Sequence, residues 1–92
     1  SMIDPDLPDA DMFVVYYTGG KVLQASNISL MTRKLDERLF LVSTPETQSR
    51  LYHHVKRLAQ PDALFVGRLD SLPKFKGMEE GTTKWVRRVM DA

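Results

Sequence analysis

The chain contains no cysteine. This absence excludes a disulfide framework, a thiolate nucleophile and a zinc site built on cysteine, and it is typical of a reducing compartment. Residues 3–11 also lack the positive and apolar segments of a secretory signal. We therefore expect a cytoplasmic protein that uses no metal and no cofactor.

Long hydrophobic runs are lacking as well. No apolar stretch approaches the roughly 20 residues that a membrane span requires, so we expect no contact with a membrane. Apolar residues nevertheless make up 42% of the 92 residues, which suffices for a core. A chain of this size buries about 60–65% of the surface that its unfolded form exposes. Composition thus excludes intrinsic disorder and a two-lobed enzyme, and it predicts one domain over residues 12–92.

Lys and Arg are lacking from the first eleven residues, which carry four Asp and two Pro and form a predicted acidic tail at residues 1–11. The rest of the chain holds all 13 Lys and Arg and the other 8 of the 12 Asp and Glu, a net charge of +5 within an overall +1. A mildly basic domain can meet a polyanion, but this excess is too small to identify a nucleic-acid-binding protein.

Strand-like composition dominates the first half of the domain. Residues 12–17 are β-branched and aromatic, and Thr18-Gly19-Gly20-Lys21 supplies a hairpin turn before a second strand at 22–25. Residues 28–33 read as a third strand with rough alternation. Residues 39–42 form an uninterrupted apolar run, which indicates a central strand buried on both faces. A further strand is predicted from Ala63 as far as Leu69.

Two amphipathic helices are predicted in the second half. The first begins with Thr44 as its cap and Pro45 at its first position, and its apolar stripe consists of Leu51, Val55, Leu58 and Ala59. The second spans about residues 79–90, with Trp85 as the expected anchor. The element order is then β-β-β-β-α-β-α. It predicts an α+β fold with a mostly antiparallel sheet of four or five strands and both helices on one face.

Motifs of catalysis are absent. His53 and His54 diverge by 100° on a helix, so they cannot grip one metal together, and the scattered carboxylates have ordinary roles in turns and at helix starts. The Gly19-Gly20-Lys21 segment lacks the spacing of a phosphate-binding loop. Tyr16, Tyr17 and Trp85 are expected in the core, with one tyrosine on each face of the sheet. No group of residues resembles the signature of a known family, and we expect no enzyme.

Basic residues on the two predicted helices are the best candidates for a binding surface. They merge into one patch if the helices are neighbours, and Phe75 can then stack on a base. Six phosphate contacts would give a log–log salt slope no steeper than about −5 on duplex DNA. The candidate residues are Arg50, Lys56, Arg57, Lys74, Phe75, Lys84, Arg87 and Arg88.

These features support two functions of different classes. The preferred one is a small protein-binding module, such as an accessory, adaptor or inhibitor protein of a bacterium or phage, which also forms a homodimer. The alternative is electrostatic binding of nucleic acid without base specificity. Protein binding requires an exposed apolar patch or an open sheet edge, whereas nucleic-acid binding requires the basic residues to be contiguous. A third interpretation, a hydrolase that uses His54, would need a partner residue that the sequence does not indicate.

Overall fold

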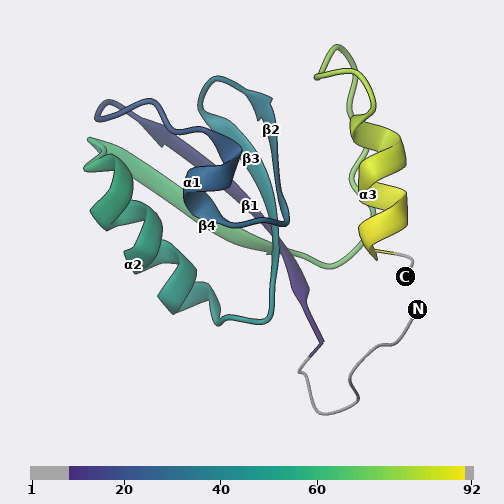
Figure 1. The fold of residues 1–92 in the computed structure, drawn as a ribbon, viewed down its shortest axis with the longest axis horizontal. Coiled ribbons are helices and arrows are strands. Elements are labelled where there is room, and N and C mark those ends of the chain that lie inside the picture. Colours follow the sequence, from purple (N-terminus) through teal and green to yellow (C-terminus); the bar gives the residue numbers. More distant parts are fainter. Residues whose placement is uncertain (1–8, 91–92) are drawn as a thin grey trace.

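Four strands form one open antiparallel sheet in the computed structural model, which describes residues 9–90 (Figure 1). The strand order is β2-β3-β1-β4, so β2 and β4 are the edges. This arrangement confirms the α+β class and the antiparallel sheet. In chain order the elements are β1 (Asp11–Thr18), α1 (Ala25–Ile28), β2 (Thr32–Asp36), β3 (Leu39–Thr44), α2 (Gln48–Ala59), β4 (Ala63–Leu69) and α3 (Thr82–Met90).

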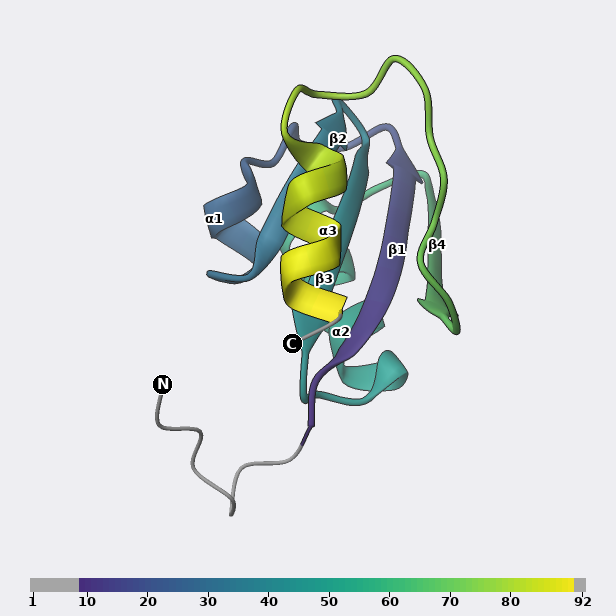
Figure 2. The ribbon, with the colours of Figure 1, turned by 90° about the vertical axis from the view of Figure 1, so that its right-hand side faces the viewer.

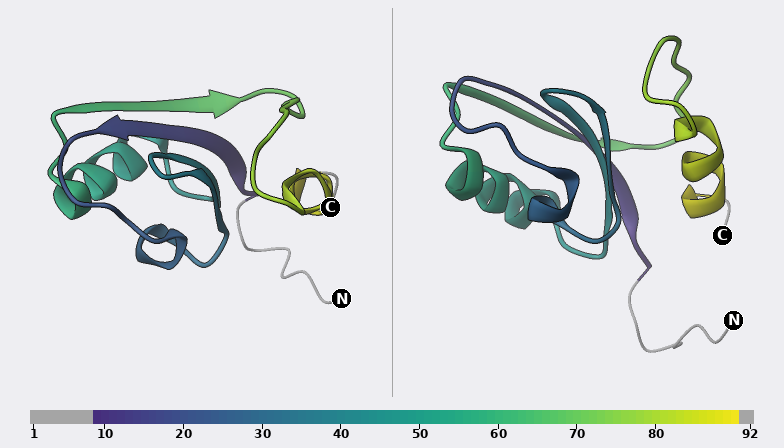
Figure 3. Two further views of the ribbon diagram at one scale, coloured as in Figure 1. Left: turned by 90° about the horizontal axis from the view of Figure 1, so that it is seen from above. Right: turned by 45° about the horizontal axis from the view of Figure 1, so that its top comes forward.

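The first face of the sheet, defined as the face that carries Phe13, Val15 and Tyr17 of β1, holds the larger part of the core. Phe40 and Val42 of β3 are buried beside them. Both α1 and α2 cover this face (Figure 3). The predicted apolar stripe of α2 is confirmed, because the residues of α2 that are buried in this core are Leu51, Val55 and Ala59.

The second face is packed against α3, so the prediction that both long helices share one face is wrong. Figure 2 shows α3 in front of the strands and α2 behind them. The buried cluster on this face consists of Met12, Leu35, Leu41 and Val86. The reason lies in β3, where Phe40 and Val42 point to one face and Leu41 points to the other, and all three are buried. A central strand that is apolar on both sides needs cover on both sides.

The predicted hairpin does not form, although Gly19 and Gly20 both adopt positive φ angles, of +69° and +68°. The N–H of Lys21 donates to the carbonyl of Ala59 at the end of α2 (2.8 Å) and not to a returning strand. The buried hydroxyl of Tyr17 accepts the N–H of Leu23 (2.9 Å) and donates to the Lys21 carbonyl (2.8 Å). The segment after the glycines is therefore held across the end of α2, and it leads into the short α1.

The start of α2 lies three residues later than predicted. Its cap is Thr47, whose side chain accepts an N–H of the first turn (3.2 Å). The predicted cap, Thr44, ends β3 and accepts the N–H of Glu46 (3.1 Å). Pro45 consequently lies in the connection and not at the first helical position.

Other boundaries shift by a few residues. The third predicted strand begins only at Thr32, and its first residue, Ile28, ends α1. The last helix begins at Thr82. Residues 1–8 of the predicted acidic tail lie outside the described residues, and Asp11 belongs to β1 and not to the tail.

Candidate binding surfaces

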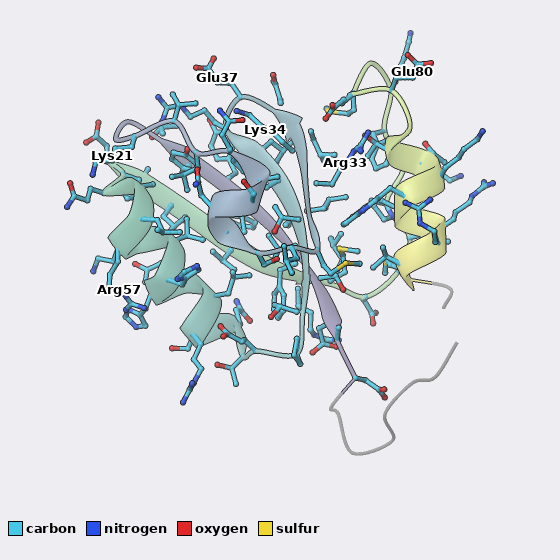
Figure 4. All side chains as sticks on the ribbon, viewed as in Figure 1. Lys21, Arg33, Lys34, Glu37, Arg57 and Glu80 are labelled. Carbon is cyan, nitrogen blue, oxygen red and sulfur yellow. The ribbon has the colours of Figure 1, made fainter. Side chains whose placement is uncertain are left out.

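The predicted basic residues lie on two sides of the molecule. Those on α2, Arg50, Lys56 and Arg57, are exposed beyond the first face. Those on α3, Lys84, Arg87 and Arg88, are exposed beyond the second face. Since the sheet separates the two helices (Figure 2), the six cations do not form the single patch that the sequence suggested. Figure 4 shows Arg57 on the α2 side, far from α3.

The loop before α3 joins the second of these groups. Lys74, Phe75 and Arg87 line one cleft of about 360 Å³, and Phe75 also lines a neighbouring cleft with Lys84. The ring of Phe75 is only partly exposed, because it packs against the core of the second face. It is therefore not the free ring that base stacking requires. What remains on this side is a group of cations around α3.

A third cleft, of about 430 Å³, lies between α2, the end of α1 and the end of β3. Arg50, His53 and Arg57 line it from α2. His54 lies at its wall, where its Nε2 is 3.1 Å from the carbonyl oxygen of Ile28. This contact gives His54 a structural role between α2 and the end of α1. We call this space the α2 cleft.

Part of the second face is not covered by α3. Along β1, Met12 is buried, Val14 is half-buried and Tyr16 is 48% exposed. Phe65 of β4 lies directly opposite Tyr16 and is 59% exposed. We call this part the uncovered half of the second face. It consists of the exposed Tyr16 and Phe65 and of the partly buried Val14, Leu39 and Gly67.

Gly67 leaves room for the ring of Phe65 beside it. A Cβ built on Gly67 would lie 3.2 Å from Cε1 of the Phe65 ring and 3.7 Å from a methyl carbon of Val14. The ring thus folds along its own strand toward Gly67. Gly67 and the Phe65 ring therefore form one continuous part of this apolar surface.

The outer edge of β4 borders this surface. The N–H of Tyr17 donates to the carbonyl of Arg38 (3.2 Å), so the odd-numbered residues of β1 bond toward β3 and the even-numbered ones toward β4. The residues of β4 that pair with the even-numbered residues of β1 are odd-numbered, so the backbone groups of these odd-numbered residues point toward β1. The backbone groups of Leu64, Val66 and Arg68 therefore point outward.

Within residues 9–90, a side chain occupies one of the outward-facing groups: Gln48 donates its Nε2–H to the Val66 carbonyl (3.0 Å). A shallow groove lined by Gln48, Ser49, Tyr52 and Val66 runs between this edge and α2. An open edge of this kind is a template for another strand unless it is blocked, and Gln48 shields only its middle.

Neither the uncovered half of the second face nor the β4 edge was found from the sequence. The sequence did contain part of the information needed to find the uncovered half of the second face. The rule that adjacent strand residues point to opposite faces correctly separates Tyr16 from the buried Tyr17. The expectation that both pack in the core was wrong for Tyr16, because the length and position of α3 decide how far the second face is covered.

Other kinds of site find little support. The part of the chain that the structure describes contains no group of three His, Cys, Asp or Glu side chains that could hold a metal ion. Among the described helices, none has the length and apolar character needed to cross a bilayer. No family model, no curated protein and no solved structure matches this chain.

Proposed function

We propose that the chain is a small non-catalytic protein-binding module, and that the uncovered half of the second face is its contact surface. The observation that carries the proposal is the pair Tyr16 and Phe65, two large aromatic side chains that lie side by side on neighbouring strands and stay about half exposed. Aromatic residues are enriched in the centre of protein interfaces, where each buries a large apolar area.

The β4 edge supports the same proposal. The outward N–H and C=O groups of β4 lie at the open edge of the sheet, directly beside Phe65. A partner strand placed there would gain main-chain hydrogen bonds, while its side chains would meet the uncovered half of the second face on one side and the groove beside Tyr52 on the other. The proposed compartment is still the cytoplasm, on the ground of the missing cysteines.

The test is a pull-down from the native host with matched surface variants. Tyr16→Ser and Phe65→Ser each remove an exposed ring from the uncovered half. Leu30→Ser is the control, because Leu30 is 96% exposed in the loop between α1 and β2 and belongs to neither surface. Partners captured by the parent chain should be lost from the two ring variants and kept by the control, at equal melting temperatures. Capture that survives in both ring variants would disprove the proposed surface.

The alternative function, electrostatic binding of nucleic acid, now rests on a smaller surface. Lys74, Lys84 and Arg87 line adjoining clefts, and Arg88 is exposed on the same helix as the last two. We propose that any contact with a polyanion uses this α3 side. The cations of α2 cannot join it, because they lie beyond the other face of the sheet.

A further inference from the structure

The α2 cleft combines an apolar floor with a cationic rim. Its floor includes Ile28, Val42 and Leu51, all of which are buried core residues. The rim on α2 consists of Arg50, His53 and Arg57. These three positions are spaced by three and four residues, so they lie within about 60° of one another around the helix axis. The long side chains of the two arginines can therefore converge on one bound group.

The two guanidinium groups have no acidic partner among residues 9–90. Helix α2 contains no acidic residue. Among the described residues, the one salt bridge of the structure joins Arg33 to Glu79, remote from this cleft. Arg50 donates its backbone N–H to Thr47, but the guanidinium group of neither rim arginine makes a hydrogen bond within residues 9–90. Each guanidinium carries five N–H donors in a fixed planar fork that matches the oxygens of a phosphate.

Hydroxyl groups line further parts of the cleft. Ser29, Thr44 and Ser49 line the cleft. The hydroxyl of Ser29 is 2.7 Å from that of Thr32, and the carbonyl of Ile28 is held by His54. These two contacts hold Ser29 and Ile28 in place at the cleft, which lowers the entropy cost of ordering them on binding.

Glu46 is the acidic residue that lines the cleft. It precedes α2, and its backbone N–H is bound by Thr44 (3.1 Å). Its carboxylate opposes an anionic ligand by like-charge repulsion, so it weakens the site but does not neutralise both arginines.

We propose that the α2 cleft binds a small phosphate monoester, with the phosphate held by Arg50 and Arg57 and the organic group resting on the apolar floor. The volume of about 430 Å³ lies within the usual range of about 300–1,000 Å³ for small-molecule sites. This site is separate from the uncovered half of the second face, because it lies beyond the opposite face of the sheet. It shares Ser49 with the groove beside the β4 edge, but Arg50 and Arg57 do not line that groove. Failure of one proposal therefore leaves the other standing.

The experiment is a calorimetric titration of the full chain with three probes: phenyl phosphate, inorganic phosphate and phenol. Phenyl phosphate should bind at least about fivefold more tightly than inorganic phosphate, because its ring buries apolar area on the floor. Phenol should not bind measurably. Equal affinity for the two phosphates would contradict the role given to the floor, and no binding of phenyl phosphate at millimolar concentration would overturn the site.

Matched variants separate a site from general attraction by positive charge. Arg57→Gln and Arg50→Gln should each weaken phenyl phosphate binding by about tenfold or more, the loss of a charge-assisted hydrogen bond. Lys56→Gln removes the same charge from the same helix at an exposed position that does not line the cleft, and it should change the affinity by less than about twofold. Glu46→Gln should tighten binding. Equal effects of Arg57→Gln and Lys56→Gln would overturn the proposal. All four substituted positions are exposed, so we expect the four variants to fold like the parent chain.

Discussion

Tyr16 and Tyr17 are adjacent in β1 and have opposite environments. The hydroxyl of Tyr17 is buried and makes two hydrogen bonds to the backbone at Lys21 and Leu23. Tyr17→Phe leaves those two backbone groups without their partner, and we expect a loss of about 1–3 kcal/mol in the free energy of unfolding. Tyr16→Phe is the control and should be neutral within about 0.5 kcal/mol, because Tyr16 is half exposed. Urea denaturation of both variants measures the difference.

A result in which Tyr16→Phe costs as much as Tyr17→Phe would contradict the assigned hydrogen bonds. The sequence predicts that the two rings lie on opposite faces of the sheet. It does not predict what the Tyr17 hydroxyl binds, because that depends on a segment folded back over the end of α2.

Gly20 has a specific reason to be glycine. A Cβ at this position would overlap the carbonyl oxygens of Ala59 and Gln60, in addition to the strain of its positive φ. Gly77 also has a positive φ, of +75°, but nothing lies within 4 Å of its virtual Cβ. Gly77→Ala should therefore cost about 1 kcal/mol from backbone strain alone. Gly20→Ala should cost clearly more, about 2–4 kcal/mol.

Thermal unfolding of the two alanine variants provides the comparison. Equal costs would show that the approach of this loop to α2 is looser than the structure indicates. The sequence identifies a turn at Gly19 and Gly20, including the sign of φ. The predicted second strand of the hairpin, after the turn, was wrong. The N–H of Lys21 donates to the carbonyl of Ala59, a residue far along the chain, and not to a neighbouring strand.

At the scale of elements, the helices were easier to predict than their placement. The apolar stripe of α2 follows from its period alone. The structure buries Leu51, Val55 and Ala59, and the fourth predicted residue, Leu58, is partly buried against the same core. The choice of sheet face depends on which neighbours remain uncovered, which no local pattern encodes. The two-sided burial of β3 was the available evidence that both faces need a helix.

Helix α3 is attached by one apolar cluster and by polar contacts just before its start. Arg33 of β2 points toward the start of this helix (Figure 4), where its Nη2 donates to the Glu80 carbonyl (2.6 Å) and its Nε lies 3.9 Å from the Glu79 carboxylate. This ion pair is partly exposed and adds little stability. The apolar contacts are centred on Val86, which is fully buried, whereas Trp85, the predicted anchor, is only partly buried.

Val86→Asp should therefore release α3 while the core of the first face stays folded. An unpaired carboxylate in place of a buried valine costs several kcal/mol, more than the local packing of this short helix supplies. Hydrogen exchange should show rapid exchange of the α3 amides and continued protection of β1 and β3. Thr83→Asp, at an exposed position of the same helix, is the control and should preserve protection. Uniform loss of protection over the whole sheet would show that α3 is part of one cooperative unit.

At the scale of the whole molecule, the uncovered half of the second face also provides a surface for self-association. The predicted homodimer would bury Tyr16 and Phe65 of both copies around a two-fold axis. Light scattering at micromolar concentration should then give twice the 10.5 kDa of one chain. Phe65→Ser should return the mass to that of one chain, and Leu30→Ser should not. A parent chain that scatters as a monomer would exclude the dimer.

The division of the basic residues by the sheet changes the expectation for nucleic acid. A single patch of six cations would make up to six phosphate contacts and give a salt slope near −5 on duplex DNA. Two groups on opposite sides cannot contact one duplex together. We therefore expect that any binding uses the α3 side, with the cations of α2 left in solvent.

Two triple variants with equal loss of charge test this expectation in a fluorescence-anisotropy titration at several salt concentrations. Replacing Lys84, Arg87 and Arg88 with Gln removes three phosphate contacts, so the log–log slope should become shallower by about 2.7. Replacing Arg50, Lys56 and Arg57 with Gln lowers the net charge equally but should leave the slope nearly unchanged, because the slope counts phosphates neutralised in the complex. Equal changes in both variants would mean that binding is spread over the whole surface, and a larger change in the α2 variant would place the contact on the opposite side of the sheet.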